Sequence, residues 1–289
     1  MQNKPNTIIG YVELKTANLE ISLNYYQKLL GFQLIQQADD KAYLSASGAH
    51  PAQIILSLMP RALDKPYRTT GLYHLAIKLP NRRELALLLK RLLDNNVSLL
   101  GLSDHLVSEA IYISDPDDNG IEIYCDRPSS GWSVTNNEEV NMTTKHLSPK
   151  TLFMELDIRD EWSGIHPEAV IGHIHLQVSD LQASEVFYSQ ILGLNITQKS
   201  YPGALFFAAN NYHHHIACNI WSSKNAPPPG EDTVGLEEFS IILPTHEELL
   251  RTINRAMKAG YLTLKDSDIS SIKSIRLQDP SKIKLHLTI

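Results

Sequence analysis

The chain has 289 residues, of which 43% are hydrophobic and 20% are charged, and its formal net charge is −6 at pH 7. This length is enough for about two domains that each bury a core. The acidic balance argues against a nucleic-acid partner, and no stretch approaches the ~18 apolar residues of a membrane span.

The first residues contain no apolar core of a signal peptide, and the chain has two cysteines, Cys125 and Cys218. Both cysteines lie in strand-like runs in different halves of the chain, so buried reduced thiols are expected. These features favour a cytoplasmic protein.

The first half of the chain contains two similar units. Residues 10–19 (GYVELKTANL) alternate like a half-buried strand, and the amphipathic helical run that follows closes at Gly31. Residues 71–80 (GLYHLAIKLP) form a second such strand, followed by a helical run, short strands and a turn at Asp115-Pro116. Each unit therefore reads as one strand, one helix and about three further strands.

Residues 127–168 break this pattern. They begin with RPSSGW, continue through an Asn-, Glu- and Thr-rich stretch and end in a short helical run. We interpret this segment as the connection between the two halves, partly packed through Trp132 and Phe153.

The second half repeats the first. Residues 172–181 (GHIHLQVSDL) match 10–19 and precede a helical run that closes at Gly193, and residues 235–244 (GLEEFSIILP) match 71–80. The chain therefore contains four βαβββ modules, which start near residues 8, 71, 171 and 235.

The turn at Asp279-Pro280 matches the earlier Asp-Pro turn and fixes the register of the last strands. Counting from these turns places Glu122 opposite His286. The spacing agrees, because 74 to 122 and 238 to 286 are both 48 residues.

Several motifs of this layout resemble the vicinal oxygen chelate superfamily, which includes glyoxalase I, fosfomycin-resistance proteins and type I extradiol dioxygenases. The motifs are GLYHLAIKLP, DHLVSEAIYISDPDDNGIEIYCDRP, GHIHLQVSDL and YHHHIACNIW, and they are most similar to the two-domain bacterial catechol-2,3-dioxygenase-like group. The resemblance covers nearly the whole chain outside the connection.

The resemblance implies an α+β fold in which the four modules form two tandem paired-module domains with open, curved sheets. We accordingly expect a structural N-terminal domain at residues 1–128, the connection at 129–168, and a C-terminal domain with a metal site at 169–289.

In this superfamily the metal lies in the cleft of a module pair and is held from four slots, on the first and last strands of each module. In the C-terminal domain the slots contain His173, His215, Glu238 and His286. The dioxygenases carry a histidine at the slot of Glu238 and a glutamate at the slot of His286, so the resemblance predicts that this pair is exchanged. The alternative is a solvated Glu238 and a degenerate site closed by His286.

Strand geometry supports a cluster of imidazoles in this domain. Residues i and i+2 of a strand share a face, so His173 and His175 point the same way, as do His213 and His215, with His214 opposite. Imidazoles with a carboxylate suit a divalent ion. We predict Fe(II), with Mn(II) or Zn(II) as alternatives.

The slots of the N-terminal copy contain Tyr11, the apolar run 53–58, His74 and Glu122. His74 and Glu122 match the family pattern, but Tyr11 and the apolar run do not complete a set. We expect this domain to be metal-free, as is typical of the two-domain extradiol dioxygenases, with a weak second site as the alternative.

The resemblance implies an extradiol dioxygenase that cleaves a catechol-type aromatic with O₂. His175 and His213 are candidates for proton transfer, and Tyr201 and Tyr212 could hydrogen-bond a substrate oxygen or serve ordinary packing. A glyoxalase-type isomerase or hydroquinone-processing metalloenzyme, with Glu238 as the base, is one alternative. A non-catalytic binder of small aromatics is another, against which the pair His173 and His215 argues. Edge strands of open sheets could also pair between subunits of a homo-oligomer.

Overall fold

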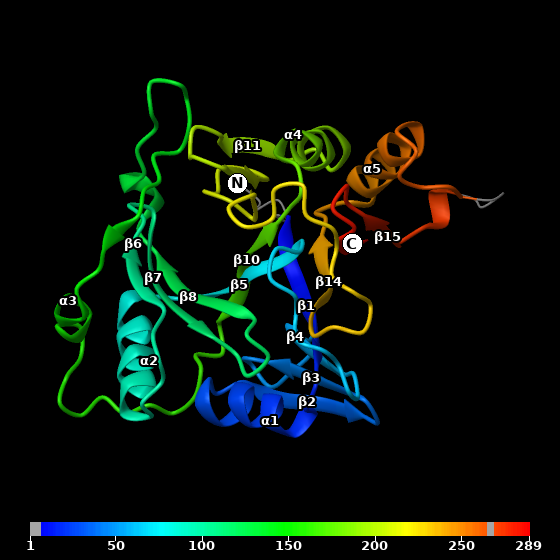
Figure 1. The fold of residues 1–289 in the computed structure, drawn as a ribbon. Coiled ribbons are helices and arrows are strands. Elements are labelled where there is room, and N and C mark those ends of the chain that lie inside the picture. Colours follow the sequence, from blue (N-terminus) through cyan, green and yellow to red (C-terminus); the bar gives the residue numbers. More distant parts are fainter. Residues whose placement is uncertain (1–6, 265–268) are drawn as a thin grey trace.

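The computed structural model describes residues 7–264 and 269–289. They form four modules, each with a first strand, a helix and two or three further strands (Figure 1). The predicted α+β fold of four repeated modules is confirmed. None of the helices in these residues has both the length and the apolar character needed to cross a bilayer.

The first two modules have closely similar element orders. The first contains β1 (Ile8–Thr16), α1 (Leu19–Asn24) with a π-helical extension (Tyr25–Leu29), β2 (Gln33–Ala38), β3 (Lys41–Ser45) and β4 (Ile54–Leu58). The second contains β5 (Gly71–Leu79), α2 (Arg82–Asp94), β6 (Gly101–Asp104), β7 (Ser108–Ser114) and β8 (Gly120–Asp126).

The connection adds a 3₁₀ turn (Ser129–Gly131), the short strand β9 (Lys145–His146) and the helix α3 (Pro149–Phe153). The third module contains β10 (Val170–Gln177), α4 (Leu181–Glu185) with a π-helical extension (Val186–Ile191), β11 (Asn195–Gln198), β12 (Ala204–Ala208) and β13 (Ile216–Asn219). The fourth contains β14 (Gly235–Ile242), α5 (His246–Lys258), a 3₁₀ turn (Ile269–Ser271), β15 (Ser274–Gln278) and β16 (Lys284–Thr288).

The module helices begin where a polar side chain can replace a missing intrahelical partner. In each case the side chain before the helix accepts a hydrogen bond from the backbone N–H three residues further on; these caps are Asn18, Asn81, Asp180 and Thr245. Gly31 and Gly193, with φ of +81° and +83°, follow the first and third helical segments. Local sequence therefore decides where these elements start and stop.

The modules pair across the two halves of the chain. The strand orders are β15-β16-β14-β1-β4-β3-β2 in a seven-stranded sheet and β11-β12-β13-β10-β5-β8-β7-β6-β9 in a nine-stranded sheet. The first module is thus joined to the fourth by β1 and β14, and the second to the third by β5 and β10, both antiparallel. This differs from the tandem pairing expected from the chain order, because each first strand offers a similar open edge and the repeat does not specify which module fills it.

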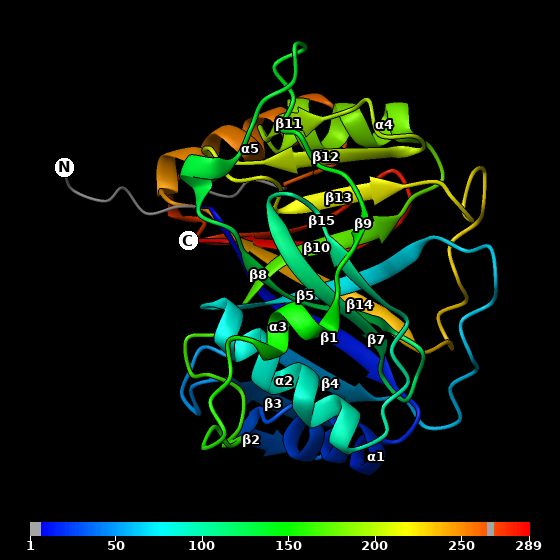
Figure 2. The same ribbon diagram turned by 90° about the vertical axis from the view of Figure 1, so that its left-hand side faces the viewer.

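Modules that are neighbours in sequence still share core contacts. The Tyr26 hydroxyl donates to Asp115 at 3.0 Å, and the Tyr188 hydroxyl donates to Asp279 at 2.9 Å, so each Asp-Pro turn is tied to the helix of the preceding module. All four side chains are buried. In Figures 1 and 2, α1 and α2 lie at one end of the molecule and α4 and α5 at the other, with the strands of both sheets between them.

Candidate metal centre

Three adjacent strands of the nine-stranded sheet carry the candidate ligands: β10 carries His173, β5 carries His74 and β8 carries Glu122. Ala76 on β5 is paired with His173 on one side and with Glu122 on the other. The methyl group of Ala76 leaves the space between the two longer side chains open. The sheet register therefore brings together residues that are far apart in sequence.

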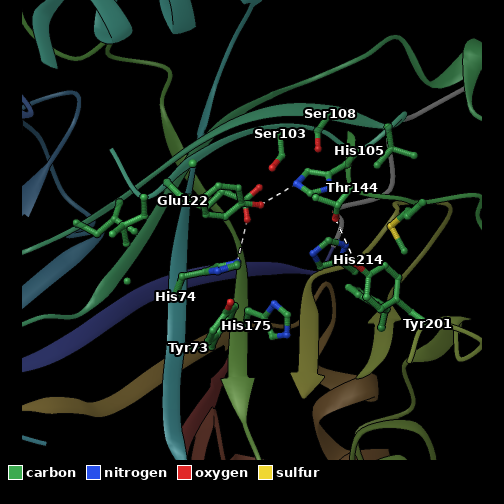
Figure 3. Close-up of a pocket in the computed structure, with 18 of the residues that line it drawn as sticks. Tyr73, His74, Ser103, His105, Ser108, Glu122, Thr144, His175, Tyr201 and His214 are labelled. Carbon is green, nitrogen blue, oxygen red and sulfur yellow. Dashed lines mark hydrogen bonds and ion pairs between the residues drawn. The ribbon is translucent and has the colours of Figure 1, made fainter. Parts of the chain in front are cut away.

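The three side chains form a compact group, of which Figure 3 shows His74 and Glu122. One ligand atom from each lies within 4.8 Å of the others. A Glu122 oxygen is 2.9 Å from His74 Nε2 and 3.3 Å from His173 Nε2. Within the described residues this is the only such group of three or more His, Cys, Asp or Glu side chains.

Burial and charge set the protonation of this group. Burial would raise the pKa of Glu122, but the charge and hydrogen bond of His173, together with His74, hold it well below its usual range. Burial lowers the pKa of His173 to about 4, and the charge of Glu122 only partly opposes this. At neutral pH the cluster therefore offers a carboxylate and a neutral imidazole, which are the forms that bind metal ions.

The cluster fits a divalent cation because it contains buried ring nitrogens without hydrogen-bond partners. His74 Nε2 and His173 Nδ1 are buried, and neither makes a hydrogen bond. His74 Nε2 lies 2.9 Å from a Glu122 oxygen without a hydrogen bond, so a cation coordinated by both atoms would satisfy this nitrogen. Two imidazoles and one carboxylate are a donor set typical of divalent iron, manganese or zinc.

The fourth family slot of this module pair contains no ligand. β13 runs parallel to β10 and pairs Ala217 with His175, just as β8 pairs Glu122 with Ala76 on β5. Ala217 is thus the counterpart of Glu122, and its methyl group cannot coordinate a metal. A metal held by the three ligands would keep open positions for other molecules.

A cavity of about 440 Å³ lies beside His74 and Glu122. Its walls are largely aromatic, as expected for a site that orients a small ring; they include Tyr73, Tyr112, Tyr201, Phe206 and Trp221. His105, His175 and His214 add imidazoles (Figure 3). The cavity therefore combines an apolar surface with several groups that can exchange protons.

Hydrogen bonds fix the orientation of two of these groups. His105 Nδ1 lies 2.8 Å from the Thr143 carbonyl, which can only accept, so Nδ1 donates and Nε2 accepts from the Tyr112 hydroxyl at 2.7 Å. Tyr112 is paired with Glu122 across β7 and β8, and burial followed by the Glu122 charge raises its pKa well above the usual value. Tyr112 thus remains protonated beside the cluster.

The residues predicted around His173 divide between the cavity and a neighbouring polar cluster. His175 and Tyr201 line the cavity, and His175 Nε2 accepts a hydrogen bond from the Asn219 amide at 3.0 Å. His213 and Tyr212 instead contact Asp126 in that cluster.

The structure does not bring His215 to the ligand cluster. Its Nδ1 accepts from the Ala209 N–H at 3.2 Å, and its ring lines a different cavity beside Tyr212. The strand begins only at Ile216, so the alternation expected over 213–215 does not apply, and His214 is the residue that reaches the cavity.

Glu238 and His286 lie in the other sheet, on β14 and β16. There Glu238 forms a bidentate ion pair with Arg276, at 2.8 and 3.1 Å, and accepts a hydrogen bond from Tyr11. The Tyr11 hydroxyl is also 3.1 Å from His286 Nδ1. The structure thus separates both residues from His173.

The strand register shows why Glu238 and His286 were expected beside His173, where the structure has His74 and Glu122. Glu238 pairs with Glu13, and Ser240 with His286, in the same relation as His74 with His175 and Ala76 with Glu122. The slots of Glu238 and His286 are therefore assigned correctly, whereas the last-strand slot of the third module is occupied by Ala217 and not by His215. The signal that was missed is that joining the second module to the third gives two histidines and one glutamate.

Comparisons with known proteins identify relatives of this chain. The chain is 42% identical over 278 residues to Catechol-2,3-dioxygenase of Bacillus subtilis (strain 168), covering 95% of this chain and 94% of that protein. A solved Bacillus subtilis subsp. subtilis str. 168 protein whose name includes the word dioxygenase shares the fold, with a TM-score of 0.66, 14% identity, and coverage of 99% and 86%. Glyoxalase I of Zea mays shares it with a TM-score of 0.58, 14% identity, and coverage of 98% and 92%.

A family model matches both halves of the chain, at residues 8–123 and 170–287. These ranges leave out the connection and cover all four modules. The chain therefore belongs to the Glyoxalase/Bleomycin resistance protein/Dioxygenase superfamily.

Proposed function

We propose that the chain is an Fe(II)-dependent extradiol dioxygenase that opens the ring of a catechol-type aromatic with O₂. The observation that carries this proposal is the group His74, Glu122 and His173 beside an aromatic-lined cavity. The 42% identity to a protein named Catechol-2,3-dioxygenase over almost the whole chain supports the same reaction.

His74, Glu122 and His173 would hold the metal through two imidazoles and one carboxylate. Bound Fe(II) supplies Lewis acidity and a template on which substrate and O₂ meet. The chain's own contribution is to fix the ligands, exclude water and supply groups that move protons.

The cavity provides these groups on opposite walls. His214 packs against His173 with a ring-centroid distance of 4.2 Å, and burial lowers its pKa well below the usual value, so it is neutral and can accept a proton from a substrate hydroxyl. Tyr112 keeps its proton and donates it to His105, so its hydroxyl oxygen can accept a hydrogen bond from a substrate hydroxyl. Tyr73 and Trp221, whose ring centroids lie 5.3 Å apart, form an aromatic wall for the ring.

The two alternative functions have less support at this site. An isomerase that uses Glu238 as its base would need that carboxylate in the cavity, whereas Glu238 is paired with Arg276 in the other sheet. A non-catalytic binder would have no use for three converging ligands. A cytoplasmic location and assembly into a homo-oligomer remain predictions.

The test is anaerobic loading of the protein with Fe(II), binding of catechol, and exposure to air. We expect oxygen uptake in proportion to catechol and a yellow ring-opened product. His173→Ala should abolish both, while His286→Ala, which removes a histidine from the matching position of the other sheet, should keep them. Full iron loading and catechol binding without oxygen uptake would contradict the proposal.

A further inference from the structure

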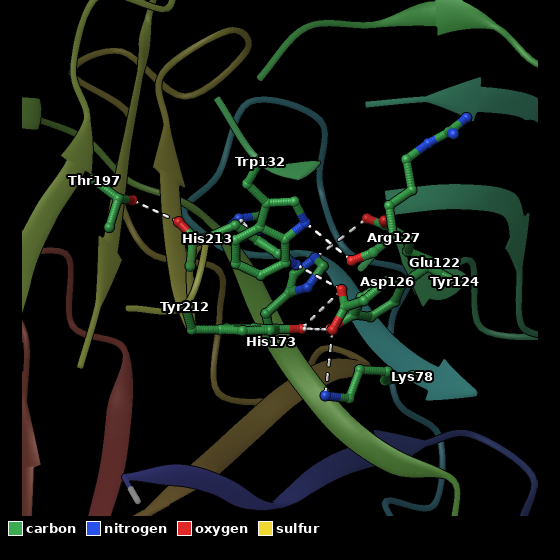
Figure 4. Close-up of polar contacts among 11 residues, drawn as sticks. Lys78, Glu122, Tyr124, Asp126, Arg127, Trp132, His173, Thr197, Tyr212 and His213 are labelled. Carbon is green, nitrogen blue, oxygen red and sulfur yellow. Dashed lines mark hydrogen bonds and ion pairs between the residues drawn. The ribbon is translucent and has the colours of Figure 1, made fainter. Parts of the chain in front are cut away.

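A second polar cluster lies next to the cavity, around the C-terminal end of β8. It consists of Asp126, His213, Tyr212, Tyr124 and Lys78 (Figure 4). Among these residues, His213 also contacts His214, which lines the cavity. The cluster is therefore connected to the space where we place the substrate.

A short hydrogen-bonded series of three side chains, Asp126, His213 and His214, links this cluster to the cavity. His213 Nε2 lies 2.9 Å from Asp126 Oδ1, and His213 Nδ1 lies 2.8 Å from His214 Nδ1. His213 is completely buried. Both nitrogens of His213 are therefore engaged, one toward Asp126 and the other toward the cavity histidine.

Asp126 is held as a carboxylate. Burial would raise its pKa, but the hydrogen bond and charge of His213, with Lys78 at 3.4 Å and Tyr212 at 3.1 Å, lower it. An ionised carboxylate can only accept hydrogen bonds, so His213 Nε2 donates to it.

The direction of the hydrogen bond to Asp126 determines the direction of the next one, between His213 and His214. When His213 carries a single ring proton and donates it through Nε2, its Nδ1 can only accept, and the proton between the two histidines then belongs to His214 Nδ1. The remaining nitrogen of His214, Nε2, then has a free lone pair. This is the form in which an imidazole can take a proton from a hydroxyl group.

The surroundings hold the series in place. The Tyr212 ring stacks on His213 with centroids 4.1 Å apart, and Thr197 donates to the His213 carbonyl at 2.6 Å. The Tyr124 hydroxyl contacts that of Tyr212 at 2.7 Å, which orients the Tyr212 proton toward Asp126. The His213 ring cannot turn without breaking its hydrogen bonds to Asp126 and His214.

We propose that Asp126 and His213 are positioning residues that fix the tautomer of His214, so that His214 Nε2 can accept the substrate proton. The proposal rests on the proposed dioxygenase function for its catalytic meaning. The tautomer itself is a property of the protein and can be measured separately.

The first test is ¹⁵N NMR of the histidine rings in the full-length protein loaded with Zn(II), which is diamagnetic. We expect His214 protonated at Nδ1 and His213 at Nε2, and we expect Asp126→Ala to change the His214 pattern. A His214 protonated at Nε2 in the unaltered protein would overturn the proposal, whether or not the enzyme is active.

The second test is kinetic, on Fe(II)-loaded enzyme with catechol. Asp126→Ala and His213→Gln should lower kcat by about 10²-fold with little change in KM, and Asp126→Glu should recover part of the loss. Glu238→Gln is the matched control, because Glu238, like Asp126, is a carboxylate with a tyrosine and a cation as partners, and it should leave kcat unchanged.

The outcomes separate the two proposals. If the unaltered enzyme does not consume oxygen, the proposed function fails and the NMR result still decides the tautomer. If it is active and Asp126→Ala and Asp126→Glu, both folded by circular dichroism, keep full kcat, the positioning role is wrong.

Discussion

His173, His175, His214 and His215 are all buried, and burial lowers the pKa of each ring below its ordinary value. Their rings are therefore neutral near pH 7, ready to bind a metal or accept a proton. The same burial couples these residues to stability, because the unfolded chain takes up protons that the folded chain does not.

His215 allows this coupling to be tested away from the metal ligands. Burial lowers its pKa from 6.5 to about 4, so the unfolded state binds the extra proton between these values, and the free energy of unfolding falls as the pH drops from 6.5 to 4. His215→Asn can keep the acceptor for the Ala209 N–H without the titration. We expect the variant to lose less stability over this range, by up to about 3 kcal/mol.

The measurement is denaturant unfolding of both metal-free proteins at pH 7.5 and pH 4.5. Working without metal prevents ligand protonation from adding metal release to the comparison. The same pH dependence in both proteins would show that His215 is not neutral in the folded state.

At the residue scale, the sequence predicts which strand position a residue occupies better than it predicts which side chains that residue contacts. His173 and the slots of His74 and Glu122 could be identified because strand spacing is regular and the 48-residue interval repeats. His214 could not be identified, because whether residues 213–215 lie inside or before a strand depends on tertiary pairing. Asp126 lies within the motif that ends in CDRP, but the motif does not indicate its role, which comes from contacts with Lys78 and His213 in distant parts of the chain.

At the element scale, the first strands of the second and third modules position the site. β5 and β10 approach each other closely, and Gly172 on β10 shows how closely: a Cβ built there would lie 1.9 Å from the Tyr124 hydroxyl and 3.0 Å from Lys78 Cβ. The strands themselves were predictable from alternation, and their helices from Gly stops. Which strand would lie beside β10 was not, because antiparallel pairing with β5 is a long-range choice.

We therefore expect Gly172→Ala to strain the contact between β10 and Tyr124. The loss of stability should be about 1–3 kcal/mol, as for overpacking of a well-packed core. Gly131→Ala, where an added Cβ meets no atom within 4 Å, is the control and should change stability little. Thermal unfolding of both variants checks this, and equal melting temperatures would show that β10 can shift at no cost.

At the scale of the whole molecule, the two sheets are related but carry different chemistry. Tyr11, Glu238 and His286 stand where the nine-stranded sheet has His173, His74 and Glu122. Arg276 pairs with Glu238 and brings a fixed positive charge to a position that a metal could otherwise share. The four-module repeat was predictable from the sequence, but which sheet carries the metal ligands depends on which modules pair.

This arrangement predicts one metal ion per chain. Glu122→Gln should remove bound iron, because an amide cannot supply the charge of the carboxylate, while Glu238→Gln and His286→Ala should retain it. Metal analysis of purified, Fe(II)-loaded protein is the measurement. Two ions per chain, with one lost in His286→Ala, would contradict the assignment of a single centre.

The first module pairs with the fourth and the second with the third. This pairing also determines when each sheet and the metal centre can form during synthesis. A nascent chain that has emerged as far as the connection contains His74 and Glu122 but not His173. The seven-stranded sheet cannot form until Ile242, the pairing partner of Ile8, has been synthesised. Metal acquisition is therefore a late step that requires the second half of the chain. A truncated product lacking that half would have two of the three proposed ligands, so we expect it not to retain a metal ion.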